Sequence, residues 1–335
     1  MKKTTLAAGI LVIALAVVVL LAALNTGASV PGPQKTVPLT VGGPALETSA
    51  LVYIAQDQHF FEKNGLNVTF REYDSGGTTI GGLTKGDVDI GLMSEFVMVN
   101  GISQGDNLTG IATTDKFQNM FLVTRKDRGI NSIADLKGRT VGLPEGTIAE
   151  FYMGRYLTLH GMDADEVNLV NVRPAQTAEA VENGTFDAVV TWHPFLDTIL
   201  EQNSTGVAVW PIQSGQLTYW TAVSRRDWAD SHRPEMTRFL RSLADAEQYM
   251  MYHPDDAQRI VEKRLNYTDT YIGGIWQDNQ FSLSLDQSLI TAMEDESRWL
   301  ISGNSTTMTT IPDFRNVIDP TILGSIKPGS ADIMR

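Results

Sequence analysis

A glycine-rich stretch, YDSGGTTIGGLTKGDVDIG, runs from Tyr73 to Gly91 and directly follows a segment with the composition of a β-strand. Its turn contains Ser75, Gly76, Gly77 and Thr78. Such residues before a helix expose N–H and hydroxyl groups that bind an anion or another acceptor. The nucleotide-binding loops of similar composition do not fit, because Gly82 stands where the lysine of a P-loop should be and no G-x-G-x-x-G pattern is present. We therefore expect this turn to contact a solute.

Similar residues follow other predicted strands, namely Glu47, Thr48, Ser49, Ser94, Glu95, Gly146, Thr147, Trp192 and His193. Taken singly, each has an ordinary structural explanation. Thr48 or Ser49 is a suitable helix N-cap, worth ~1 kcal/mol, a lone tryptophan is usually part of a core, and a histidine before a proline is usually a turn residue. Ligands of open α/β sheets bind outside the carboxyl ends of the strands. Because all of these residues follow strands, their joint placement predicts that they line one binding crevice.

The elements that must position these residues alternate along the chain, which is typical of an α/β protein. Helices are predicted between the strands, for example at Ala50–Lys63 and Ile148–His160, and again after Arg226, for example at Leu285–Leu300. Predicted strands begin at Val37, Asn67, Val88, Leu108, Met120, Thr140, Val167, Phe186, Val207 and Leu217.

The helical C-terminal region has no sheet of its own, so we expect it to pack on the first half of the chain. This gives two lobes, each a mostly parallel sheet flanked by helices, with a crevice between them. Lobe one would hold residues 37–120 and 222–335, lobe two residues 121–215, and the second crossover residues 216–221.

The composition excludes several classes of function. The formal net charge is -13, and no cluster of Lys and Arg is visible, so nucleic-acid binding is not expected. The chain has no cysteine, so it has no thiolate metal site and no cysteine nucleophile. We also find no hydrolase elbow and no paired-histidine metal spacing. The expectation is a protein that is not an enzyme, with no metal and no cofactor.

The N-terminus has a different composition, with Lys2 and Lys3 before the uninterrupted apolar run Leu6–Leu24. A helix of about 20 apolar residues crosses a bilayer core, and the two lysines place the rest of the chain outside the cell. Residues 1–24 are therefore predicted to be a membrane anchor, with a cleavable signal peptide as the alternative. Residues 25–36, with Pro31 and Pro33, are predicted to be a linker.

Glycosylation sequons agree with an extracytoplasmic location. Asn67, Asn107, Asn183, Asn203, Asn266 and Asn304 are each followed two places on by Ser or Thr. Such sequons mark acceptor sites in exported proteins, although unused sequons are common.

Five blocks in order between about residues 37 and 265 resemble the nitrate/sulfonate/taurine-type solute-binding proteins of ABC transporters. They are LVYIAQDQHFFEKNGLNVTF, GLTKGDVDIGLMS, SIADLKGRTVGLPEGT, AVENGTFDAVVTWHPF and HRPEMTRFLRSLADAEQYMMYHPDDAQRIV. The resemblance implies a type II periplasmic-binding fold that closes on a solute. It also implies that an ABC permease and its ATPase are the partners and that the protein is a monomer.

Carried over by motif, the resemblance assigns solute contacts to Thr48, Ser49, Gly76, Gly77, Thr78, Ser94, Glu95, Gly146, Thr147, Trp192 and His193. The position of His193 is often Glu in the family. The lipid-modified cysteine of the bacterial pattern is absent, and the N-terminal anchor would replace it. Trp210, Tyr219 and Trp220, near the second crossover, are either walls of the site or core.

The expected solute is taurine-like or nitrogenous, because acidic residues outnumber basic ones near the predicted mouth of the crevice. They are Glu47, Asp74, Glu95, Asp115 and Glu145. Two alternatives remain open: a ligand-binding sensor ectodomain, and a relative of the same fold that works in thiamine-pyrimidine synthesis. The latter relatives carry a cysteine-rich cluster, which this chain cannot supply.

Overall fold

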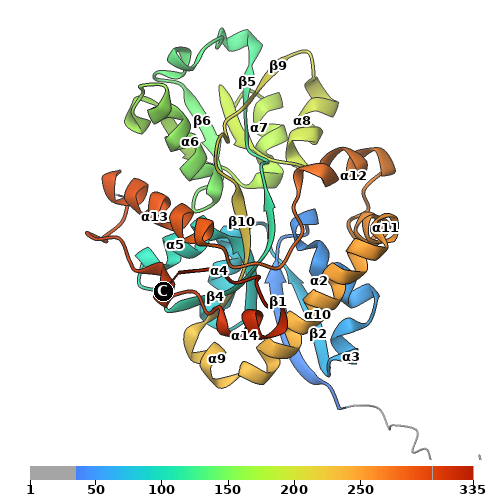
Figure 1. Ribbon diagram of the computed structural model, residues 1–335. Coiled ribbons are helices and arrows are strands. Elements are labelled where there is room, and N and C mark those ends of the chain that lie inside the picture. The colour runs from blue at the N-terminus through green and yellow to red at the C-terminus, as the bar shows by residue number, and fades with distance from the viewer. Residues whose placement is uncertain (1–34, 304, 335) are drawn as a thin grey trace, which may run out of the picture. The chain divides into compact units, whose positions relative to one another are not determined.

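The computed structural model describes residues 35–303 and 305–334. The predicted anchor or signal peptide, residues 1–24, most of the linker and Asn304 lie outside the described residues. In the part that is described, no helix combines the length and the apolarity needed to cross a membrane. Residues from Val37 onward form one compact unit, and Figure 1 shows two sheets in it, each flanked by helices.

The sheet of lobe one has the strand order β2-β1-β3-β10-β4. Its strands are β1 (Val37–Gly43), β2 (Leu66–Glu72), β3 (Ile90–Ser94), β4 (Leu108–Phe117) and β10 (Thr218–Arg225). Strand β1 pairs in parallel with β2 and β3, whereas β10 is antiparallel to both β3 and β4. Four strands of this sheet therefore run in one direction.

The sheet of lobe two has the order β7-β6-β8-β5-β9. Its strands are β5 (Phe121–Arg125), β6 (Thr140–Leu143), β7 (Asn168–Asn171), β8 (Ala188–Thr191) and β9 (Val207–Pro211). Strand β6 is parallel to β7 and β8, and β5 is antiparallel to β8 and β9. The expected mostly parallel sheets are confirmed. The reversed strand in each lobe, β5 or β10, is the one by which the chain enters that lobe.

Helices cover both sheets. Lobe one has α2 (Ala50–Asp57), α3 (Phe60–Lys63), α4 (Gly76–Lys85) and α5 (Glu95–Ser103), and lobe two has α6 (Ile148–Leu159), α7 (Thr177–Glu182) and α8 (Phe195–Asn203). Short 3-10 turns occupy Glu47–Ser49 (η1), Lys126–Arg128, Ile133–Leu136, Ala164–Glu166, Pro174–Gln176, Trp276–Asp278 and Phe314–Asn316. The prediction of one continuous helix over Ala50–Lys63 is wrong, because His59 adopts a left-handed conformation with φ 56°.

The C-terminal helices pack on lobe one, as the sequence predicts. They are α9 (Arg226–Ser231), α10 (Arg233–Tyr252), α11 (Pro254–Leu265), α12 (Asp269–Ile275), α13 (Gln287–Ser302) and α14 (Thr321–Ile326). Helix α10 contacts α2, α3 and α14, and α13 contacts α5. Helix α13 begins two positions after the predicted Leu285, because Leu285 forms a β-bridge to Ala331.

Two chain segments connect the lobes, between β4 and β5 and between β9 and β10 (Figure 1). Residues 218–221, which the sequence assigns to the second crossover, belong to β10 because they pair with β3 or β4. The buried side chain of Gln213 joins both connections. Its Oε1 accepts from the Asn119 N–H at 2.9 Å, and its Nε2 donates to the Phe117 carbonyl at 3.0 Å. A single amide therefore ties the two hinge strands together.

Candidate functional site

A pocket lies between the lobes at the carboxyl ends of the parallel strands. Its empty space is about 500 Å³, the open mouth included. Among the predicted site residues it is lined by Glu47, Thr48, Ser75, Gly76, Ser94, Thr147 and Trp192. Both lobes therefore contribute to one cavity.

Other lining residues were missed by the sequence analysis. They are Pro44, Leu46, Val97, Phe117, Asn119, Met120 and Ile148. Most are apolar, and Phe117, Asn119 and Met120 lie where the chain first leaves lobe one. Trp220, which the sequence left as wall or core, is part of the wall, whereas Tyr219 and Trp210 are not among the lining residues. A segment that connects the two lobes must pass beside the crevice. This argument could have predicted that Phe117, Asn119 and Met120 line the pocket.

Two of the predicted glycines meet across the cleft instead of lining the pocket. A Cβ atom added to Gly77 would lie 3.1 Å from the Gly146 carbonyl oxygen and 3.4 Å from Thr147 Cγ2. Gly146 has φ 68°, a left-handed conformation that favours glycine. At this place the two lobes approach so closely that a side chain at position 77 would need its neighbours to move.

The remaining predicted residues have local roles. Thr78 forms a capping box with Ser75 at the start of α4. The Ser49 side chain is buried beside Tyr53. His193 precedes a cis peptide bond to Pro194, and its ring contacts the Asp197 carboxylate. None of these three is a lining residue of the pocket.

Several hydrogen-bonding groups in the pocket wall have no partner within the described residues. They are the hydroxyls of Thr48 and Ser94 and the indole nitrogen of Trp220. Thr48, Ser94 and Trp220 are 3 %, 2 % and 6 % exposed. Because a buried polar group without a partner costs about 1–3 kcal/mol, these groups are suited to a polar ligand.

Glu47 is the charged group of the pocket. Its side chain is 1 % exposed, and burial raises its pKa to about 7. From other residues it receives a long hydrogen bond, 3.5 Å, in which the Tyr267 hydroxyl donates to Oε2, and its own backbone N–H also lowers the pKa. No lysine or arginine is found among the pocket-lining residues of the described chain.

Glu95, also predicted to contact solute, faces a different environment. It accepts from the Tyr219 N–H at 3.0 Å and lies within hydrogen-bonding reach of Glu296 on α13. Both carboxyl groups are fully buried, and burial raises both pKa values above the ordinary range. Glu95 does not line the pocket, so its placement in the solute site is not supported by the geometry.

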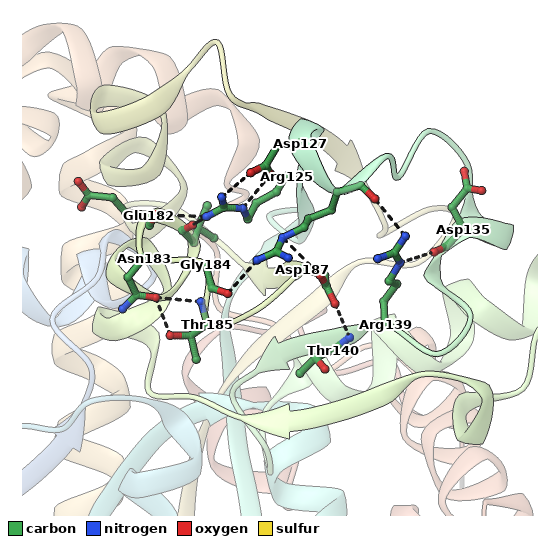
Figure 2. A network of polar contacts seen from close by, with 12 residues as sticks. Arg125, Asp127, Asp135, Arg139, Thr140, Glu182, Asn183, Gly184, Thr185 and Asp187 are labelled. Atoms are coloured by element: carbon green, nitrogen blue, oxygen red, sulfur yellow. Dashed lines mark hydrogen bonds and ion pairs between the residues drawn. The ribbon is translucent and has the colours of Figure 1, made fainter.

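A group of arginines lies at the other end of the lobe-two sheet. Figure 2 shows Arg125, Arg139 and their partners around Asp187 and the start of β6. Arg125 binds Asp127 and the Glu182 carbonyl, Arg139 donates to the Arg128 carbonyl at 3.0 Å, and Asp187 accepts from the Thr140 N–H at 2.9 Å. Because the crevice lies at the carboxyl ends of β6 and β8, these cations are distant from the pocket.

The two lobes touch at several places. Asp74 of lobe one forms an ion pair with Arg173 of lobe two at 3.3 Å. The rings of Phe96 on α5 and Phe151 on α6 stack with centroids 5.8 Å apart, and Arg155 on α6 pairs with Asp295 on α13 at 2.6 Å. These contacts define a closed arrangement of the lobes.

Two hinged lobes around a small interlobe pocket define the class of solute-binding proteins with the periplasmic-binding fold. The sequence model described as "NMT1/THI5 like" matches residues 47–257, and the chain belongs to this family. The resemblance to nitrate/sulfonate/taurine-type binding proteins is confirmed.

Individual relatives agree with this class. The taurine-binding periplasmic protein of Escherichia coli K12 is 28% identical over 219 residues, covering 63% of this chain and 67% of its own. The structure of an alkanesulfonate-binding protein from Xanthomonas axonopodis pv. citri, bound to MOPS, matches with a TM-score of 0.73 at 16% identity, covering 84% of this chain and 98% of its own. A desulfurization enzyme shares the fold, with a TM-score of 0.61 at 15% identity over 86% of this chain and 98% of its own.

Proposed function

We propose that the protein is an extracytoplasmic solute-binding component of an ABC importer, which captures a small organic solute between its lobes and delivers it to a permease. The single observation that carries this proposal is the interlobe pocket, whose Thr48, Ser94 and Trp220 hydrogen-bonding groups have no partner within the described residues. A ligand in the pocket would contact both lobes at once.

The proposed mechanism is a population shift. Residues Thr147 and Trp192 reach the pocket from lobe two, and Ser75 and Ser94 reach it from lobe one. A solute that contacts both sides binds the closed form better than the open form and so shifts the equilibrium toward closure. The permease would then recognise the closed protein, and no covalent step is needed.

We propose a taurine-like or nitrogenous solute. The pocket pairs neutral hydrogen-bond donors with one buried carboxyl group, and Trp192, 9 % exposed, offers an aromatic wall. A bare dianion such as sulfate would meet Glu47 without a compensating cation in the described wall, which is an unfavourable arrangement for an anion.

A thermal-shift screen of the full chain against taurine, other sulfonates, nitrate, amines and pyrimidines tests this function. A bound solute raises the melting temperature in proportion to RT ln(1 + [L]/Kd). We expect stabilisation by an organic member of the panel. Stabilisation by inorganic oxyanions alone would contradict the proposed solute class, and no stabilisation by any small molecule would contradict the function.

Two substitutions test whether the solute binds in this pocket. In Gly76→Val, the new side chain would meet the Met93 Cβ at 3.1 Å and its Cα at 3.3 Å. Trp192→Ala removes a lobe-two wall. Both are expected to weaken binding of the solute found by the screen by tenfold or more, whereas the control Gly81→Val, at a position with open space around it, should bind normally.

We propose that the protein is not an enzyme. A serine or threonine nucleophile needs an adjacent base, yet neither the Thr48 nor the Ser94 hydroxyl has a hydrogen-bond partner in the described part of the chain. Incubation of the full chain with the solute found by the screen, followed by mass spectrometry, should return the solute unchanged.

Membrane tethering by residues 1–24 and glycosylation also remain proposals. Asn183 lies on the surface, and its Oδ1 accepts from the Thr185 N–H at 2.9 Å (Figure 2). Asn67, Asn107 and Asn266 are exposed as well. Mass spectrometry of the protein from its own host, with and without removal of N-glycans, tests both proposals through the mass of the N-terminal peptide and of the sequon peptides.

A further inference from the structure

The Glu47 carboxyl group combines three features that a structural glutamate rarely has together. It is 1 % exposed, it lines a cavity, and it forms no ion pair with a lysine or arginine in the described structure. A buried carboxylate is normally paired with a cation, since burying an unpaired charge is costly. The Glu47 carboxylate therefore has the properties of the acidic member of an ion pair whose cation is not supplied by the described residues.

The ionisable groups around Glu47 do not supply the other half. His193 and Asp197 lie beside it from lobe two, Tyr267 reaches it from the turn before α12, and Asp115 faces it from β4. His193 already contacts Asp197, and Asp115 is a second fully buried acid. The surroundings are thus acidic on balance.

A groove with acidic walls adjoins this place. It is bordered by α8 and α12, and Asp197, Glu201 and Asp278 lie along it together with Tyr271 and His193. No lysine or arginine is among the residues that border it within the described chain. Tyr271 stacks edge-on against Tyr267, with centroids 4.6 Å apart, and Tyr267 hydrogen-bonds to Glu47. The field of this groove attracts cations toward Glu47.

The pocket wall also holds polar groups of another kind. Thr48, Ser94 and the Trp220 indole N–H can all donate hydrogen bonds, and none has a partner among the described residues. These groups, together with the N-terminus of α4 at Gly76, suit an acceptor such as a sulfonate or a carbonyl oxygen. The site therefore offers different chemistry to two different groups of one ligand.

We infer that Glu47 is a cation-binding subsite, which holds a protonated nitrogen of the solute while the hydroxyl and indole donors hold its acceptor group. This inference rests on the proposed function and narrows its solute class to amines and other cationic nitrogen compounds. Glu47 is then the specificity-determining residue, because a solute lacking the nitrogen would leave a buried carboxylate unpaired.

If Glu47 bound an anion instead of a cation, the affinity for the solute would change with pH in the opposite direction. Protonated Glu47 could donate to an anion, and anion binding would then weaken as pH rises through the pKa of about 7. A cation instead prefers ionised Glu47, and aliphatic amines stay protonated to about pH 9 and beyond. Binding of an amine should therefore strengthen about tenfold from pH 6 to pH 8, as the ionised fraction of Glu47 rises.

The test compares taurine, its hydroxyl analogue isethionate and ethanolamine by isothermal titration calorimetry on the full chain at pH 6 and pH 8. Taurine and isethionate share the sulfonate and differ only in ammonium against hydroxyl. We expect taurine to bind at least tenfold more tightly than isethionate at pH 8, and ethanolamine to bind measurably without any sulfonate. In Glu47→Gln this preference and its pH dependence should both disappear.

Glu179→Gln is the matched control, since Glu179 is an exposed glutamate on α7 and its loss changes the net charge equally. Equal binding of isethionate and taurine, or a preference that survives in Glu47→Gln, overturns the inference. Failure of every amine to bind overturns it as well. The proposed function fails separately, only if no member of the wider thermal-shift panel stabilises the protein.

Discussion

Two buried acidic sites in this protein have the same chemistry and different surroundings. Glu47 begins the η1 turn after β1, and Glu95 begins α5 directly after β3. Both are fully buried and both have raised pKa values because of desolvation. Glu47 lines the interlobe pocket, whereas Glu95 is fully buried beside Glu296.

The difference shows what a buried acid needs in order to be a ligand site. Glu95 and Glu296 can share a proton, so the pair satisfies itself without any external cation. Glu47 has no second carboxyl group within hydrogen-bonding reach and faces a cavity instead. An enclosed pair of carboxyl groups thus retains a proton that the two groups share. A single carboxyl group beside a cavity is instead available to bind a solute.

The largest expected effect concerns the enclosed pair. Because the pair holds its proton more tightly in the folded state, its contribution is fully present below about pH 4.5 and is lost as pH rises toward 8. The free energy of unfolding should fall by about 1.4 kcal/mol per pH unit for each proton retained. Glu296→Gln removes one of the two carboxyl groups. The slope should therefore fall by about 1.4 kcal/mol per pH unit, the value for one proton, and urea unfolding at several pH values measures it.

The groups that face the pair belong to several elements. Tyr152 approaches from α6 and Tyr219 from β10, while Asp295, the neighbour of Glu296, is neutralised by Arg155. Tyr152 and Tyr219 stay protonated across this range, since their pKa values are raised. A wild-type free energy that stayed flat from pH 5 to pH 8 would show that the pair does not retain a proton.

The same comparison shows how far the sequence predicts this molecule. The ten strands of the described residues were all predicted, because most are short runs rich in β-branched or aromatic residues between turn residues. Glu95 was assigned to the solute site because it follows a strand end, like Glu47, and because the family resemblance carries it over by motif. Its partner Glu296 is on a helix far along the chain, and no local pattern reveals that pairing. Long-range packing, which alone decides whether a strand-end acid faces a cavity or another acid, was the missing information.

The break after α2 has a similar explanation. The apolar residues of Ala50–Lys63 continue at helical spacing, so the sequence predicts one helix. The structure ends α2 at Asp57 and gives His59 a positive φ, which permits Phe61 to stack on Phe239 of α10 with centroids 5.9 Å apart. Tertiary packing here overrides the local preference.

A second prediction concerns the pocket acid. In the solute-free protein, Glu47→Gln should raise the free energy of unfolding at pH 8 by about 2–3 kcal/mol and change it little at pH 4, because Glu47 ionises in its buried site only above about pH 7. Saturating solute should reduce this advantage of the variant, since a bound cation would stabilise the ionised wild-type side chain. An equal gain at both pH values would mean that packing, and not charge, limits the wild type.

A third substitution would open the enclosed pair. A Cβ atom at Gly154 on α6 would lie 2.4 Å from Cζ2 of Trp299 on α13. Trp299 follows Glu296 by three residues on the same helix, so Gly154→Ala should displace the wall of α13 beside the acid pair. We expect a loss of about 1–3 kcal/mol and, because water then reaches the pair, a shallower pH slope. Glycine at position 81, with open space around it, gives the control Gly81→Ala, which should retain the wild-type slope.

The smallest effect is expected for an acid that is exposed instead of buried. Asp74 pairs with Arg173 across the cleft at 3.3 Å, and the side chains are 56% and 65% exposed. Solvent and salt screen such a pair, which is worth about 0–1 kcal/mol. Asp74→Asn should therefore weaken solute binding less than threefold, and the difference from the wild type should vanish in 1 M salt. A larger, salt-resistant loss would place Asp74 with the buried acids, in contact with the solute, and would remove the distinction between the mouth of the cleft and its interior.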